Sequence, residues 1–350
     1  MPKRSLRSWL QKTYVTCNHM IGEKGDTMTK SNRSTKIIAF FLIFALSLVQ
    51  IPVTAQAASV RPADVSKAGK GNILVGVSGS YERVSKTTIL KRINQIRKEA
   101  CTKGYINPST REKLKPSDYV PIKWSSNLEW IAQLRAAECT VYEAHERPNA
   151  KSCFSITRKN EQSWAENLAW NYSGLMQGIE QWYGEKQDWV DQNTNKVTGH
   201  YTSLINPNYR YIGLGSFVRD TGGWYGISAE FSSNTSGSQA QSKLKGKTIQ
   251  TMEVVKKNVK QVKLNAPSSI KLKKSKSLTV TCNVTYPGIM GGTNTTKARF
   301  LKGITWKSSK PSVLSVNSSG KITAKKKGKA TITATVKGVK TVKKVITVKK

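Results

Sequence analysis

Histidine is the scarcest chemically informative residue in this 350-residue chain, which has only three, at positions 19, 145 and 200. Cysteine is also scarce, because five copies are too few for a disulfide scaffold, although they allow one or two bridges outside the cell. Acidic residues are absent between Val254 and Lys350, where 24 basic residues occur. No long apolar run follows residue 57, which excludes a second membrane segment.

The N-terminal residues 1–57 are typical of a targeting segment with a signal-peptide core over 28–57. A basic stretch precedes the apolar run 37–49, and Ala55-Gln56-Ala57 supplies small residues for cleavage. Thirteen apolar residues are short for a permanent span, although an uncleaved anchor remains the alternative. Met28 is a natural second start, so the true start codon is open. We expect an exported protein, extracellular or cell-wall associated, with no transmembrane anchor after cleavage.

Residues 58–86 show no sustained hydrophobic period, which indicates a linker. Helical spacing of apolar residues begins at Thr87, and two further helices are predicted. The second runs from Leu128 to about Ala144 and the third from Ser173 or Gly174 through Trp182 to about Val190. Strands are predicted over 199–205, 211–218 and 224–231, with a turn at Gly222-Gly223. Helices followed by an antiparallel meander favour an α+β domain.

Four short motifs then occur in order over about 90 residues. They are His145-Glu146-Arg147-Pro148-Asn149, Trp164-Ala165-Glu166-Asn167-Leu168, Trp182-Tyr183-Gly184-Glu185 and Gly199-His200-Tyr201-Thr202. With these motifs, residues 87–233 resemble the CAP superfamily (cysteine-rich secretory, antigen 5 and pathogenesis-related 1 proteins), in its bacterial secreted branch. The resemblance implies an α-β-α sandwich whose cleft gathers His145, Glu166, Glu185 and His200. The chain departs from the family pattern at Ala165, where Gly is usual, and at Ser203, where Gln is common. It also lacks the six cysteines of many eukaryotic members.

The chemistry of this tetrad points to a divalent cation such as Zn²⁺. Two neutral imidazoles, from His145 and His200, are good ligands, and the two carboxylates could complete the shell or orient the rings. The alternative is a metal-free, hydrogen-bonded tetrad. No His-Glu-x-x-His pattern identifies a metalloprotease. Because side chains alternate along the strand expected at 199–205, Ser203 should point away from His200, so we assign no catalytic residue.

Two further groups of residues leave alternatives open. Cys139 and Cys153 bracket the His145 loop, and either a bridge or two free buried thiols is compatible with the spacing. Cys101 has no obvious partner. Most tryptophans are expected in the core, although a few could line a groove for a glycan or lipid. The tryptophans in question are Trp164, Trp170, Trp182, Trp189 and Trp224.

The C-terminal part has a different pattern. After a connector over 234–258, short segments alternate strictly between apolar and polar residues, which is typical of a β-sandwich and places Cys282 on the apolar face. The stretch from Trp306 to Val316, then Ser319 to Ala324 and Gly328 to Ala334, resembles a bacterial immunoglobulin-like domain of group 2 over residues 259–350. The resemblance implies a spacer or adhesion module without catalytic residues.

The basic charge is concentrated in this second domain, because residues 87–233 hold 18 basic and 15 acidic residues. An anionic cell-surface polymer is the expected partner, since cations without counter-charges repel one another. All the basic residues after Val254 except Arg299 are lysine, which excludes sequence-specific nucleic-acid recognition. A merely solvated surface is the alternative.

The sequence therefore predicts a secreted binding protein. Its cleft would take a metal, a lipid or another small ligand, and its lysine-rich domain would hold it near the cell surface. Two other functions stay open: a metal-assisted hydrolase of peptide or wall polymer, and a structural adhesin with a non-functional cleft.

Overall fold

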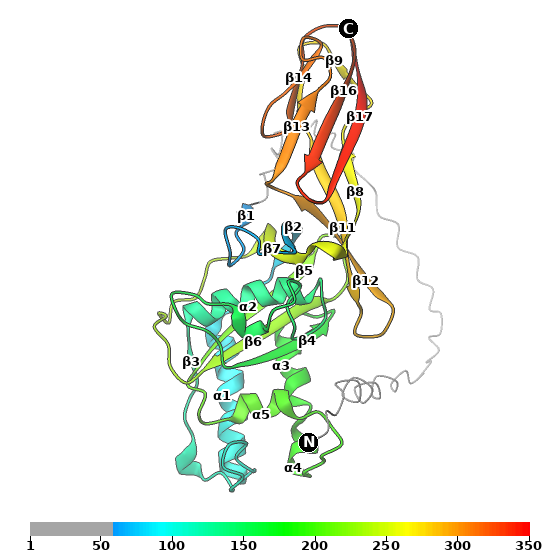
Figure 1. Cartoon of the computed structure of the whole chain (residues 1–350). Helices are drawn as coiled ribbons and strands as arrows, with labels where there is room; N and C mark the ends of the chain where they lie inside the picture. Colours follow the sequence, from blue (N-terminus) through cyan, green and yellow to red (C-terminus); the bar gives the residue numbers. More distant parts are fainter. Residues whose placement is uncertain (1–58) are drawn as a thin grey trace, which may run out of the picture. The chain divides into compact units, whose positions relative to one another are not determined.

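The computed structural model describes residues 59–350 (Figure 1). The signal segment expected over 1–57 lies outside the described residues. Within the described range, no helix combines the length and the apolar character needed to cross a membrane. The first part of the described chain contains the helices, and the second part is all β. This arrangement confirms the α+β class followed by a β-sandwich.

The predicted first two helices are present. Helix α1 (Lys86–Lys103) buries its apolar stripe. Helix α2 (Ser126–Cys139) is capped by the preceding Ser125, whose hydroxyl accepts a hydrogen bond from the Leu128 N–H at 3.3 Å. Helix α2 ends at Cys139 rather than near Ala144. The predicted third helix is two shorter ones, α3 (Leu175–Tyr183) and α4 (Lys186–Val190), which are separated by Gly184 and Glu185.

The strand predicted over 199–205 is wrong, because these residues form helix α5 (Gly199–Ile205). Tyr201, Leu204 and Ile205 are buried, which is the i, i+3, i+4 spacing of a helix face. The β-branched and aromatic residues favoured a strand. The helix forms instead because the Glu185 carboxylate accepts hydrogen bonds from the backbone N–H groups at its start. The meander expected after it is present as β5 (Tyr211–Arg219) and β6 (Tyr225–Ser232), joined by Gly222 and Gly223 at positive φ.

The large sheet has the order β4-β6-β5-β2-β12-β11-β8 and places β4 at its edge. Residues 58–86, expected as a linker, contain β1 (Ser59–Arg61) and β2 (Asn72–Tyr81). Residues 234–258 likewise end in β7 (Gly246–Val255), which pairs with all of β2. The two-residue β3 (Lys123–Trp124) pairs with β5, and β4 (Ala165–Asn171) pairs with β6. In β2, buried and half-buried residues alternate only from Val77 to Tyr81, so the strand as a whole shows no polar/apolar period.

Helices cover both faces of this sheet (Figure 1). Helix α2 packs on β5 and β6, while α1, α3 and α5 share a core with the opposite face of the same strands. Close packing of α2 requires glycine, because a Cβ at Gly213 would collide with the backbone of α2 at Glu129, and one at Gly215 would collide at Gln133. Ile212 and Leu214, which flank Gly213, point to the opposite face and pack against α1, α3 and α5. The result is the expected α-β-α sandwich.

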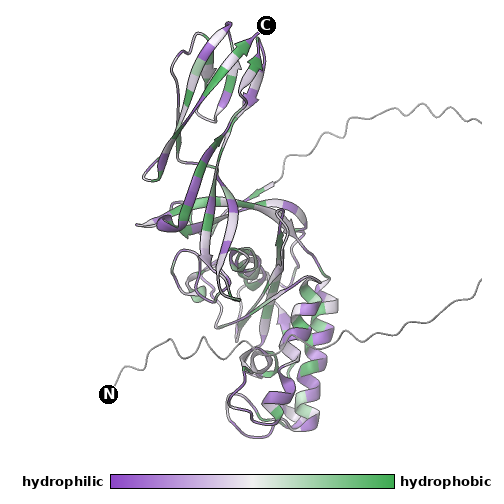
Figure 2. Ribbon diagram, turned by 90° about the vertical axis from the view of Figure 1, so that its right-hand side faces the viewer, coloured by the Kyte–Doolittle hydropathy of each residue, from purple (hydrophilic) through white to green (hydrophobic). Residues whose placement is uncertain are grey.

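The all-β part alternates apolar and polar residues along its strands, as Figure 2 shows. One layer of strands continues the large sheet and the other is the sheet β13-β16-β17-β9, with a small sheet β10-β15-β14 beside them. Cys282 is buried on the apolar face, as predicted. The strands are β8 (Val259–Asn265), β9 (Ser269–Lys271), β10 (Ser275–Ser277), β11 (Thr279–Pro287), β12 (Thr293–Phe300), β13 (Ile304–Ser308), β14 (Leu314–Val316), β15 (Lys321–Ala324), β16 (Gly328–Val336) and β17 (Lys340–Lys349).

The two parts share both a sheet and a core. Arg299 of β12 pairs with Gly76 of β2, which joins the sandwich to the first part through the large sheet. One apolar cluster contains Val75 and Met252 from the first part together with Val280 from the second. The boundary therefore lies within a packed region rather than in an extended linker.

Candidate functional site

His145 and Glu166 form the first half of the tetrad. His145 lies in the loop after α2, and Glu166 is the second residue of edge strand β4. The distance between His145 Nδ1 and Glu166 Oε1 is 2.8 Å. The imidazole is 57% exposed, whereas the carboxylate is fully buried. The pair therefore exposes the His145 imidazole to solvent and holds it against the buried carboxylate of Glu166.

Arg135 of α2 fixes the charge of Glu166. Its Nε donates to Glu166 Oε2 at 2.5 Å, and its Nη2 donates to Oε1 at 3.2 Å. Burial alone would raise the pKa of Glu166, but Arg135 and His145 outweigh it and lower the pKa to about 2. An ionised carboxylate only accepts hydrogen bonds, so the proton of this contact belongs to His145 Nδ1. In the neutral ring, the other nitrogen, Nε2, then carries the lone pair that can bind a ligand.

His200 and Glu185 form the second half. Glu185 lies between α3 and α4, and its Oε2 accepts from the backbone N–H groups of His200 and Tyr201 at 3.0 and 3.1 Å. These donors belong to the first turn of α5, so the carboxylate caps that helix. Its other oxygen, Oε1, lies 2.5 Å from His200 Nδ1. The same residue thus holds the helix and the ring that projects from it.

The structure brings these two pairs together at the edge of the sheet. On one face of the sheet, Glu166 accepts a hydrogen bond from Arg135 of α2. On the other face, its neighbour Asn167 donates to the His200 carbonyl of α5 at 2.9 Å. The imidazoles of His145 and His200 have centroids 6.4 Å apart and planes inclined by 22°. All four predicted residues therefore lie in one constellation, in which each Nδ1 is bound by a carboxylate.

A buried ionic network continues from Glu166 and was not predicted from the sequence. Arg135 also donates to Glu138 at 2.9 Å, and Glu138 accepts from Arg147 at 2.7 Å. Arg147 then pairs with Asp64 at 2.9 Å. The signal that could have found it is the occurrence of Arg135 and Glu138, one turn apart, in a helix that is buried almost all round. Buried charges require partners, and here each partner restrains the next.

Cys153 lies beside the first pair. Its sulfur, a ring nitrogen of His145 and an oxygen of Glu166 are all within 4.8 Å of one another. Burial, and then the nearby Glu166 carboxylate, raise the pKa of Cys153 to about 12, so the group is a neutral thiol. Cys139 and Cys101 are also free and buried. Of the two alternatives for Cys139 and Cys153, the structure has the free thiols.

Ser203 is engaged elsewhere, although the reason given from the sequence is wrong. In helix α5, Ser203 lies three residues after His200 and so on a similar face. Its hydroxyl donates to the Gly199 carbonyl at 2.9 Å. His200 Nδ1 is bound by Glu185, and no hydrogen bond joins Ser203 to His200 among the described residues. The two residues form no dyad.

The donor set fits a divalent cation. Each ring has its Nδ1 bound to a carboxylate, which is the usual support for a histidine that ligates metal through Nε2. Imidazoles that share a tetrahedral zinc ion at N–Zn distances of about 2.0–2.1 Å have centroids about 5 Å apart. The observed 6.4 Å is slightly larger. His145, on a loop and half exposed, is the ring that can close the difference.

Two protein-family models match this chain, one in each of its two parts. Residues 90–231 match the model of the cysteine-rich secretory protein family, CAP, and residues 258–347 match that of the bacterial Ig-like domain, group 2. No curated protein matches the chain. The chain is similar to the solved structure of BmVAL-1, with 17% identity over 46% of this chain and 82% of that one, and a TM-score of 0.31. It is also similar to Schistosoma mansoni venom allergen-like protein 4, with 14% identity over 46% of this chain and 97% of that one, and a TM-score of 0.31. The chain carries a CAP domain followed by a bacterial Ig-like domain of group 2.

Proposed function

We propose that this protein is an extracellular binding protein whose CAP cleft holds a divalent cation, such as Zn²⁺, between His145 and His200. The observation that carries the proposal is the pair of carboxylate–imidazole contacts, Glu166 to His145 and Glu185 to His200. Each contact orients its ring and leaves the other nitrogen for a ligand. A bound zinc ion would supply a Lewis-acid centre for the carboxylate or hydroxyl of a small ligand.

The residues of this site support binding and do not support covalent catalysis. Covalent catalysis needs an activated side-chain nucleophile, and the hydroxyl of Ser203, three residues after His200, donates instead to the helix backbone. The thiol of Cys153 is buried and its pKa is raised to about 12, which makes it a poor nucleophile. A lipid or another small ligand in the cleft remains part of the proposal, in contact with the cation.

The Ig-like domain is proposed to hold the protein on an anionic cell-surface polymer. Of the 24 basic residues between Val254 and Lys350, 22 are exposed and only Lys256 and Arg299 are half-buried. None has an acidic residue of its own domain to pair with.

The cation site is tested by titration calorimetry of the full chain with Zn²⁺. We expect one ion per chain, and a loss of affinity of roughly 100-fold or more in the double variant His145→Ala, His200→Ala, because both nitrogen ligands are removed. The matched control is Glu146→Gln, which removes an exposed carboxylate next to His145 but outside both pairs. Equal Zn²⁺ uptake by the double variant and the control would refute the site.

A further inference from the structure

A second pocket lies away from the tetrad, where the CAP and Ig-like domains meet. It has a volume of about 310 Å³ and is lined by the end of α2, the end of β4, the β5–β6 turn and the β11–β12 hairpin. Trp170 and Trp224 come from the CAP domain, and Asn294 comes from the Ig-like domain. Neither domain alone contains the complete lining.

Hydrogen bonds between the two domains fix the polar side of this pocket. Asn294 Nδ2 donates to the Thr140 carbonyl at 3.1 Å and to Glu143 Oε1 at 3.2 Å. The other oxygen of Glu143 accepts from the Ile289 N–H at 2.8 Å. Arg219 Nη1 donates to Asn294 Oδ1 at 3.3 Å. These contacts make the polar wall rigid before any ligand arrives.

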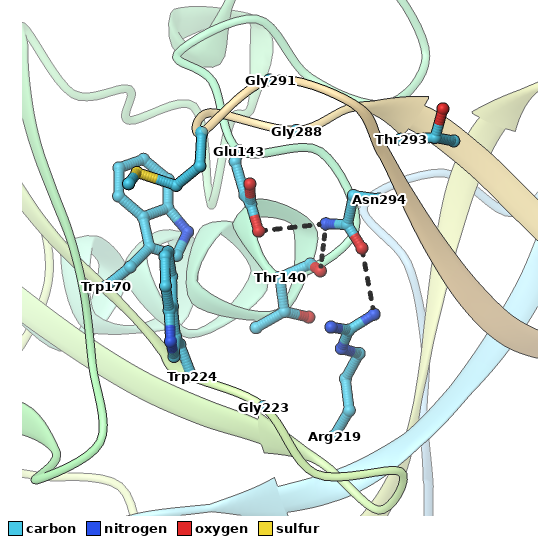
Figure 3. A pocket seen from close by; sticks show the side chains of 11 residues that line it. Thr140, Glu143, Trp170, Arg219, Gly223, Trp224, Gly288, Gly291, Thr293 and Asn294 are labelled. Atoms are coloured by element: carbon cyan, nitrogen blue, oxygen red, sulfur yellow. Dashed lines mark hydrogen bonds between the residues drawn. The ribbon is translucent and has the colours of Figure 1, made fainter. Parts of the chain in front are cut away.

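The opposite wall is aromatic. In Figure 3, the indoles of Trp170 and Trp224 lie on one side of the pocket, and Glu143, Asn294 and Arg219 lie on the other. The Trp170 N–H is already satisfied by the Cys139 carbonyl at 2.9 Å, so its ring is free only for packing. Tyr172 packs edge-on against Trp224 with centroids 5.9 Å apart, which restrains the second indole.

One donor in the pocket lining lacks a protein partner. Arg219 Nη1 bonds to Asn294 and, at 2.6 Å, to Thr296, whereas Arg219 Nη2 makes no hydrogen bond to any described residue and is not among the buried atoms. Nη2 lies beside the turn at Gly223, where an added Cβ would stand 3.3 Å from it. The pocket therefore offers a free N–H donor on one side and a flat apolar surface on the other.

We propose that this pocket binds a neutral N-acetylated sugar ring of a surface glycan. The C–H face of a pyranose packs against the two indoles, and its acetamido carbonyl accepts from Arg219 Nη2. The carboxylate of Glu143 lines the pocket and would repel a phosphate group. The guanidinium of Arg219 also lines it and would repel a cationic ligand. A lipid chain would cover Arg219 Nη2 without accepting a hydrogen bond from it.

The experiment is titration of the full chain with a soluble tetramer of N-acetylglucosamine, followed by NMR or calorimetry. Binding is expected, and Trp224→Ala should weaken it by roughly ten-fold because the variant removes one stacking face. The matched control is Trp164→Ala, which removes a tryptophan that is 60% exposed and does not line the pocket. Trp224→Phe, which keeps an aromatic face, should retain most of the affinity and excludes misfolding as the cause.

Two further outcomes decide the proposal. The glucose tetramer, which lacks the acetamido group, should bind at least several-fold more weakly, and equal binding would refute the contact with Arg219. Absence of binding to the N-acetylated tetramer, or equal losses for Trp224→Ala and Trp164→Ala, would overturn the site. The cation proposal is tested separately, because the His145→Ala, His200→Ala variant should bind the sugar as the unmodified chain does.

Discussion

Two buried glutamates with opposite pKa shifts give the sharpest test at the scale of single residues. Burial, and then the Glu166 carboxylate directly opposite in the sheet, raise the pKa of Glu230 well above its usual value. The unfolded carboxyl ionises near 4.5 while the folded one ionises only at a higher pH, so stability decreases as the pH rises above 4.5. Glu230→Gln, which is uncharged and keeps the shape, should raise the melting temperature at pH 7 and lose this advantage below about pH 4.

Glu253 provides a control of opposite sign. It is also buried, but hydrogen bonds from the Gly69 N–H and the Asn149 amide, together with Lys151, overcome burial and lower its pKa. Its ionised form therefore adds stability above pH 4.5, and this stability is lost as the pH falls. Glu253→Gln should lower the melting temperature at pH 7. Calorimetric scans of both variants at pH 7 and pH 4 measure the difference, and shifts of the same sign at pH 7 would contradict the assignment.

Single residues of the site were predictable only where a motif carried them. His145, Glu166, Glu185 and His200 stand in short patterns, so their proximity could be expected before the fold was seen. Arg135 has no such pattern, and its role depends on the distance between α2 and β4, which no local spacing encodes. Burial of charge is a property of the folded chain.

At the scale of elements, the clearest consequence concerns Glu185, which caps helix α5 and holds His200. Glu185→Ala should weaken cation binding by roughly 10–100-fold, because the ring loses its support. It should also destabilise the protein by about 1 kcal/mol through loss of the cap. Calorimetry and thermal melting measure the two effects.

Glu180→Ala is the matched control for that variant. It removes a carboxylate of α3 whose partner is Arg92 and whose side chain is 41% exposed, so the expected stability change is about 0–1 kcal/mol. Cation binding should not change. If both variants bind Zn²⁺ equally well, Glu185 does not act on His200.

Element types were predictable where the hydrophobic period was long, as in α1, β11 and β16. Element types were not predictable where the element is short or lies in the centre of the sheet. Helix α5 has only seven residues, so its cap from Glu185 decides its conformation more than its intrinsic preferences do. Strand β2 as a whole lacks alternation, and Gly79 is needed because a Cβ there would collide with Phe217. Such glycines are typical of linkers when only the sequence is known.

At the scale of the whole molecule, the uneven charge predicts salt-dependent retention on cell walls. The full chain should bind purified walls and should dissociate as the salt concentration rises, because charges are screened over about 10 Å at 0.1 M. Replacing Lys325, Lys326 and Lys327 by Gln should reduce retention measurably. Replacing three exposed lysines of α1, Lys91, Lys98 and Lys103, should not. Retention in molar salt, or on walls stripped of phosphate polymers, would contradict the electrostatic anchor.

The pairing of β2 with β7 has a consequence for the order in which the protein is made. Tyr81 pairs with Gly246 and Asn72 with Val255, so β2 is synthesised long before its partner. At about 5–20 residues per second, the interval is roughly 10–40 s. Throughout it, the edge of β2 that pairs with β7 has no partner strand. The CAP domain therefore cannot finish folding as its own sequence emerges, and its nascent form depends on the segment that leads into the Ig-like domain.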